Sequence, residues 1–88
     1  MRLKEGVIIT KIGDDHVVVA AGEAAKTFSG MIKMNGSAAF IAQAMQVDTT
    51  VEDMVKALLD KYDVSEDVAL TSVNNVVKQL TDVGLVEA

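Results

Sequence analysis

The chain has no cysteine and no tryptophan, and its aromatic residues are Phe28, Phe40 and Tyr62. The lack of cysteine excludes disulfides, thiolate metal ligands and a cysteine nucleophile. With so few aromatic rings, the chain offers little surface on which the bases of single-stranded nucleic acid could stack. No apolar run approaches the length of about 20 residues that crosses a bilayer, and the amino terminus lacks the apolar segment of a signal peptide. We therefore expect a cytoplasmic protein with no membrane contact.

Positive charge is scarce in the second half of the chain. Residues 1–47 carry five basic and four acidic residues, a balance of +1, whereas residues 48–88 carry three basic and nine acidic residues, a balance of −6; together they give the net charge of −5. A phosphate backbone would be repelled by such a half, because DNA affinity comes mainly from Lys and Arg. We therefore expect no nucleic-acid partner.

Motifs for catalysis are also missing. The chain contains no phosphate-binding glycine loop, no nucleophile elbow and no zinc-protease helix, and its single histidine has no paired nucleophile. Asp14, Asp15 and His16 together suggest a metal site, but their place between two β-branched runs is more typical of a turn. Acidic pairs such as Glu52 with Asp53 stand at expected helix starts, where the helix dipole explains them. We expect no enzymatic activity, metal or cofactor.

The first part of the chain has the pattern of a sheet. Two β-branched runs, 7–12 and 17–20, are separated by Gly13–His16 and predict an antiparallel hairpin. A short connection leads to residues 26–34, where Phe28, Gly30, Ile32 and Met34 alternate with more polar positions as in a third strand.

The rest of the chain has helical periodicity with clear starting signals. The pattern predicts helices over about 36–46, 50–62 and 65–82. Asn35 suits the first N-cap, with Ser37 as an alternative, and Ser65 suits the third. Thr49 and Thr50 each begin a capping box, so two starts compete for the second helix. The order of elements predicts one α+β domain over residues 1–88, with a three-stranded antiparallel sheet followed by three helices in a winged-helix-like arrangement.

An open sheet edge is the feature best suited to binding. An extended peptide can pair with the unpaired amides and carbonyls of an outer strand. Lys26 and Lys33 on the third strand suit either of two roles, pairing with acidic residues of a peptide or protecting the edge against aggregation. The helical period predicts that the third helix buries one stripe of residues, namely Ala69, Val73, Val76, Val77 and Leu80. Leu70 lies off this stripe and is either an ordinary surface leucine or part of a groove.

Four segments stand out by their order and spacing: Met31-Ile-Lys-Met-Asn35, Ser37-Ala-Ala-Phe-Ile-Ala-Gln-Ala44, Thr50-Val-Glu-Asp-Met-Val55 and the ending Val76-Val-Lys-Gln-Leu-Thr-Asp-Val-Gly-Leu-Val86. Together they resemble the coenzyme PQQ synthesis protein D family of precursor-peptide recognition elements. The resemblance implies a non-catalytic, winged-helix-like peptide chaperone. It would bind the leader of a ribosomally made precursor by strand addition and present it to a modifying enzyme, such as a radical S-adenosylmethionine enzyme, in PQQ synthesis or another pathway.

The resemblance also implies where the peptide binds. The leader would pair with the third strand and lie beside the third helix, so that the expected contacts come from two lists of residues. The strand contributes Thr27, Phe28, Ser29, Gly30, Met31, Ile32 and Lys33, and the helix contributes Leu70, Asn74, Val77 and Lys78.

A second interpretation remains open. An acidic winged-helix chain also suits a protein-interaction or dimerisation module of a regulator. An unfilled edge strand pairs with a symmetry mate as readily as with a peptide, so both a monomer and a homodimer are compatible with the sequence.

Overall fold

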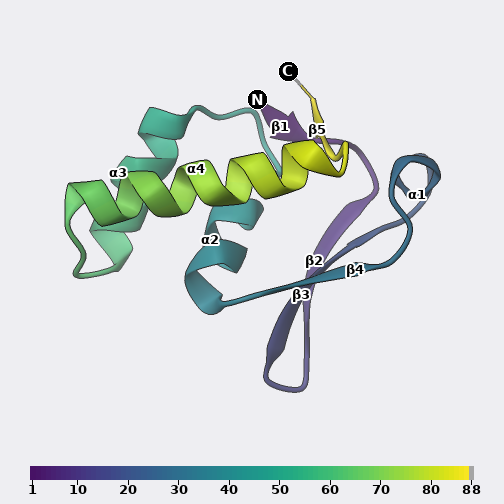
Figure 1. The fold of residues 1–88 in the computed structure, drawn as a ribbon, viewed down its shortest axis with the longest axis horizontal. Coiled ribbons are helices and arrows are strands. Elements are labelled where there is room, and N and C mark those ends of the chain that lie inside the picture. The colour runs from purple at the N-terminus through teal and green to yellow at the C-terminus, as the bar shows by residue number, and fades with distance from the viewer. Residues whose placement is uncertain (88) are drawn as a thin grey trace.

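The computed structural model describes residues 1–87 and contains five strands and four helices in this part of the chain. In order they are β1 (Arg2–Leu3), β2 (Val7–Ile12), β3 (Asp15–Ala20), α1 (Ala24–Thr27), β4 (Met31–Met34), α2 (Gly36–Ala44), α3 (Val51–Lys61), α4 (Glu66–Asp82) and β5 (Val86–Glu87). Figure 1 shows α4 running across the molecule over α2 and α3, while the β2–β3 hairpin projects away from the helices.

The main sheet has three antiparallel strands in the order β2-β3-β4, so β2 and β4 are its two edges. Ile12 stands opposite Asp15, which leaves only Gly13 and Asp14 in the turn. The turn is thus two residues shorter than expected, and Asp15 and His16 belong to β3. Gly13 has a φ of 62°, and glycine at the first turn position with positive φ is typical of the type II′ turns that suit the twist of a hairpin.

The segment before β4 differs from the sequence prediction. A strand was expected over 26–34, but Ala24–Thr27 form a single helical turn and β4 begins only at Met31. Ala24 is 1% exposed, so the turn is fixed by burial of this side chain in the core. The amide of Phe28 donates to the carbonyl of Ala24 at 3.1 Å and ends the turn. Two alanines and a lysine also favour a helix over a strand.

A second sheet was missed because its strands are too short to leave a pattern. β1 and β5 pair antiparallel, with Arg2 opposite Glu87 and Leu3 opposite Val86. Leu3 is 2% exposed and the neighbouring Leu85 is fully buried. The pairing of β1 with β5 therefore holds both ends of the described chain against the helical core.

The expected helix caps are confirmed. The side chains of Asn35, Thr50 and Ser65 accept hydrogen bonds from the amides of Ala38, Asp53 and Val68. Thr50 and not Thr49 starts α3, and the hydroxyl of Ser37 donates to Oδ1 of Asn35 at 3.0 Å instead of capping α2 itself. Because β4 ends at Met34 and the cap is the next residue, strand and helix meet without a loop.

The core lies between the sheet and the helices. α4 packs on α2 and α3, and α2 packs on β3. The stripe of α4 that faces the core was predicted correctly and consists of Ala69, Val73, Val76 and Leu80, with Val77 partly buried beside it. This arrangement leaves two flanks of α4 beside the core stripe, and only one of them faces the end of β4.

Candidate functional site: the open edge of β4 and its groove

The outer edge of β4 is open in the described part of the chain, and the sheet register shows which of its backbone groups point outward. The amide of Ala21 donates to the carbonyl of Gly6 at 2.8 Å, one step beyond the pair of Val7 and Ala20. Hydrogen-bonded pairs alternate along an antiparallel ladder. On β3, Val17 and Val19 therefore bond toward β2, and His16 and Val18 bond toward β4.

The same alternation fixes the orientation of β4. His16 stands opposite Met34 and Val18 opposite Ile32, so Ile32 and Met34 use their backbone groups inside the sheet. The amides and carbonyls of Met31 and Lys33 consequently point to the open edge. These groups are what an added strand needs for hydrogen bonding.

The side chains of β4 alternate in the same way. Ile32 and Met34 pack toward the core, whereas Met31 is 54% exposed on the outer face. The ammonium group of Lys33 lies 3.5 Å from the carboxylate of Asp15 on β3. Lys26, the other lysine expected at this edge, pairs with Glu23 at 3.3 Å. Both lysines thus have acidic partners within the chain itself.

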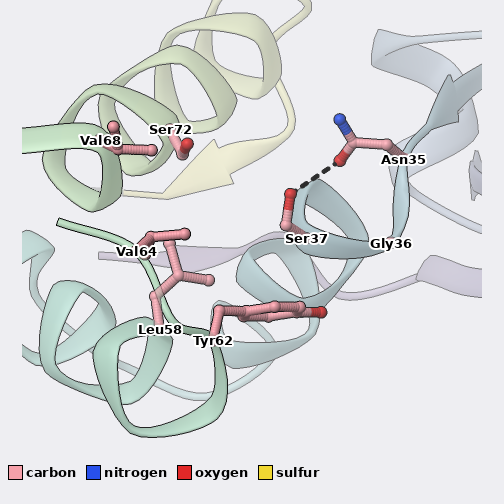
Figure 2. A pocket seen from close by; sticks show the side chains of 8 residues that line it. All are labelled: Asn35, Gly36, Ser37, Leu58, Tyr62, Val64, Val68 and Ser72. Carbon is pink, nitrogen blue, oxygen red and sulfur yellow. Dashed lines mark hydrogen bonds between the residues drawn. The ribbon is translucent and has the colours of Figure 1, made fainter.

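A groove begins where β4 ends. Asn35 and Ser37, at the start of α2, lie on one side, and Val68 and Ser72 of α4 lie on the other (Figure 2). The first part of the groove is a cavity of about 430 Å³, whose base and far wall come from Leu58, Tyr62 and Val64.

A second cavity, of about 190 Å³, shares Asn35, Ser37 and Ser72 with the first and extends it along α4 past Asn75 and Gln79. We call the two together the Asn35–Ser72 groove. Its helix wall follows a single flank, because positions 68, 72, 75 and 79 are four, three and four residues apart. None of the residues lining the groove carries a charge.

The opposite end of α4 meets the segment that precedes β4. A Cβ placed on Gly84 would come within 2.6 Å of Cγ2 of Thr27. Gly84, just after α4, therefore contacts the chain before β4, and the uncharged flank of α4 lines the Asn35–Ser72 groove after β4.

The seven residues expected from the third strand lie in different elements of the structure. Thr27 ends α1, and Met31, Ile32 and Lys33 belong to β4. Between them, Phe28 is partly buried against the core, while Ser29 and Gly30 are exposed. Gly30 has a φ of 127° and marks the point where the chain turns into the strand.

None of the four residues expected from α4 lines the Asn35–Ser72 groove. Leu70 lines a separate cavity of about 510 Å³ with residues of α3 such as Val55 and Leu59. Asn74 is exposed, and Val77 packs against the core. The ammonium group of Lys78 lies 2.8 Å from the carboxylate of Asp82, whose hydrogen bond raises the pKa of Lys78.

Sequence reasoning missed the helix residues that do line the groove, namely Val68, Ser72, Asn75 and Gln79. The buried stripe of α4 could have limited the candidate groove residues to the two flanks beside it. It could not show which flank lines the groove, because periodicity identifies the buried face of a helix and not the element that lies next to each flank.

Within residues 1–87 no group of three or more histidine, aspartate or glutamate side chains is arranged to hold a metal ion. No helix in the same range combines the length and apolar character needed to span a bilayer.

The α+β fold, with a three-stranded antiparallel sheet followed by helices, is winged-helix-like, as predicted. The chain belongs to the coenzyme PQQ synthesis protein D (PqqD) family, whose model matches residues 15–86. No curated protein matches the chain.

Two solved structures share the fold over nearly their whole length. One is described as TbiB1 in complex with the TbiA(beta) leader peptide; it is 16% identical, with a TM-score of 0.74, and the match covers 100% of this chain and 96% of that chain. The other is a lasso peptide synthetase B1 complexed with the leader peptide. It is 18% identical, with a TM-score of 0.72, and the match covers 99% of this chain and 96% of that chain.

Proposed function

We propose that this protein is a non-catalytic chaperone that binds the leader of a ribosomally synthesised precursor peptide and presents it to a modifying enzyme. The observation that carries the proposal is the outward orientation of the backbone groups of Met31 and Lys33 beside an uncharged groove. Family membership and the leader peptides in both structural neighbours support it.

The geometry suits an extended peptide better than a compact ligand. An added strand would receive its hydrogen bonds from β4 alone, because α4 supplies side chains and no free backbone in its interior. Ser72, Asn75 and Gln79 offer uncharged hydrogen-bonding groups to the peptide. Leu58, Val64 and Val68 offer apolar surface at one end.

An antiparallel peptide would have a defined direction. Its upstream end would lie opposite Met34 and reach the cavity beside Asn35, and its downstream end would leave past Gly30, near the contact of Thr27 with Gly84. In a precursor, the segment to be modified follows the leader. We therefore expect the modifying enzyme, such as a radical S-adenosylmethionine enzyme, to approach from the Gly30 end.

The test is an NMR titration of the isotope-labelled protein with a synthetic leader of the precursor encoded nearest its gene. We expect amide shifts over residues 27–35 and at Ser72, Asn75 and Gln79. Shifts confined to the cavity around Leu70 would contradict the placement of the peptide.

Two proline substitutions make a matched pair for the same titration. Met31→Pro removes an amide that points to the open edge of β4, and Lys11→Pro removes an outward amide from β2, the opposite edge. Neither amide takes part in the sheet, so both variants should fold. We expect Met31→Pro to weaken leader binding at least tenfold and Lys11→Pro to leave it unchanged. Equal affinities in two folded variants would refute strand addition at β4.

A further inference from the structure

The second edge of the sheet is also open in the described part of the chain. Gly6, Ile8, Thr10 and Ile12 direct their backbone groups toward β3, by the alternation that the bond from Ala21 to Gly6 fixes. The backbone groups of Ile9 and Lys11 point away from the sheet. The neighbouring amide of Val7 donates to the carbonyl of Lys4 at 3.3 Å, so the open segment is centred on Ile9–Lys11.

This edge carries exposed apolar side chains. Ile8 is 46% exposed and Ile12 is 56% exposed, and both lie on the face of the sheet that points away from the helices. Edge strands are commonly protected by charge, proline or a bulge. On β2 the only charged side chain is Lys11, and the strand is regular over all six residues.

The turn end of the β2–β3 hairpin extends well beyond α2 and α3 (Figure 1). The Ile9–Lys11 segment leads into this end of the hairpin.

From these features we infer that β2 pairs with β2 of a second copy of this chain across a two-fold axis. The strand is complementary to itself in one register, in which Thr10 of each copy meets Thr10 of the other on the axis. Ile9 of one copy then stands opposite Lys11 of the other, and the outward groups of both form four hydrogen bonds. Ile8 stands opposite Ile12 of the other copy, which covers the two exposed side chains.

The neighbouring registers are poorer. A shift by two positions toward the turn places Lys11 directly opposite Lys11 of the other copy, and like charges in that position destabilise a strand pair. A shift the other way places Lys11 opposite Val7, whose amide already bonds to Lys4. Self-complementarity in a single register is what an isologous two-fold interface requires, and it favours a second copy over a foreign strand.

The dimer would contain one continuous six-stranded sheet. Its outer edges would be the two β4 strands, so each copy would keep its Asn35–Ser72 groove and its open edge. Dimerisation is thus compatible with the binding of two peptides. One strand pair buries less surface than a standard interface, so the dimer should be weak and should form at high micromolar concentration.

The test is sedimentation of the full chain over about 20 µM to about 1 mM, the range suited to weak interfaces. We expect the mass to rise from monomer toward dimer. Thr10→Glu and Thr10→Lys each place like charges on the axis and should raise the dissociation constant at least tenfold. A one-to-one mixture of the two variants places Glu opposite Lys and should restore the dimer. Thr71→Glu, at another exposed threonine on α4, is the control and should behave as the unchanged chain.

Each contrary result overturns the inference. A monomer at all concentrations excludes the dimer, and a dimer that persists in folded Thr10→Glu does not use β2. A mixture that stays monomeric contradicts the register centred on Thr10. The proline pair separates this inference from the proposed function. Lys11→Pro should weaken the dimer and preserve leader binding, whereas Met31→Pro should weaken leader binding and preserve the dimer.

Discussion

Gly84 lies against Thr27, so close that a Cβ on Gly84 would come 2.6 Å from Cγ2 of Thr27. Gly84 follows α4 and has a φ of 79°, in the left-handed region that glycine adopts without strain. The contact joins the chain just after α4 to the segment that leads into β4.

Replacing Gly84 with alanine should therefore destabilise the protein for two reasons. Backbone strain should cost about 1 kcal/mol, and the overlap with Thr27 should add about 1 kcal/mol more. Gly13→Ala is the control, because Gly13 has a φ of 62° but no atom within 4 Å of the added Cβ. Urea unfolding measures both. In a Thr27→Ala background, the part of the destabilisation that comes from the overlap should disappear. If Gly84→Ala destabilises the protein equally in both backgrounds, the contact with Thr27 is not the cause.

Asn35→Ala should weaken the junction between β4 and α2. Oδ1 of Asn35 accepts from the amide of Ala38 at 2.8 Å and from the hydroxyl of Ser37 at 3.0 Å. Loss of an asparagine N-cap costs about 1 kcal/mol. Ser37→Ala removes only the second bond and should cost less than about 0.5 kcal/mol, since the hydroxyl can bond to water. Thermal unfolding gives the comparison, and equal losses would show that the cap is not the main contribution.

The sequence was a good guide to the helices because their signals are local. Asn35, Thr50 and Ser65 start helices by bonding to amides three residues ahead, which depends on no distant residue. The signals for the β2–β3 hairpin are equally local. The helical turn at Ala24 has no such local signal, because it depends on burial of the Ala24 side chain in a core assembled from the whole chain.

The candidate site could be predicted only in part for a similar reason. Period-two alternation indicates which side chains of β4 face the core. Which of its amides are free depends on pairing with β3, and that follows from the bond between Ala21 and Gly6 once the register is known. The choice between the flanks of α4 depends on packing against α2 and α3, to which periodicity is insensitive.

The pairing of Lys78 with Asp82 predicts a measurable titration. The hydrogen bond that the Lys78 ammonium group donates to the Asp82 carboxylate raises the pKa of Lys78 above its ordinary value of 10.5. A raised folded-state pKa contributes stability that is fully present below the unfolded-state pKa and is lost as the pH rises through the folded-state pKa. NMR titration of the Lys78 ammonium group should show the raised value, and Asp82→Asn should return it to the ordinary one. An unchanged pKa in Asp82→Asn would assign the shift to another cause.

Two adjacent asparagines on α4 allow a test of which flank of the helix a leader peptide contacts. Asn75 lines the Asn35–Ser72 groove, whereas Asn74 is exposed and lines none of its cavities. Tryptophan at position 75 would fill the second cavity of the groove, so Asn75→Trp should weaken leader binding at least tenfold, about 1.4 kcal/mol. Asn74→Trp adds the same bulk about 100° around the helix and should leave affinity unchanged. Isothermal titration of both variants with the same leader peptide compares them directly. The reverse order of affinities would place the peptide on the flank of Leu70 and Asn74, as the family resemblance first implied.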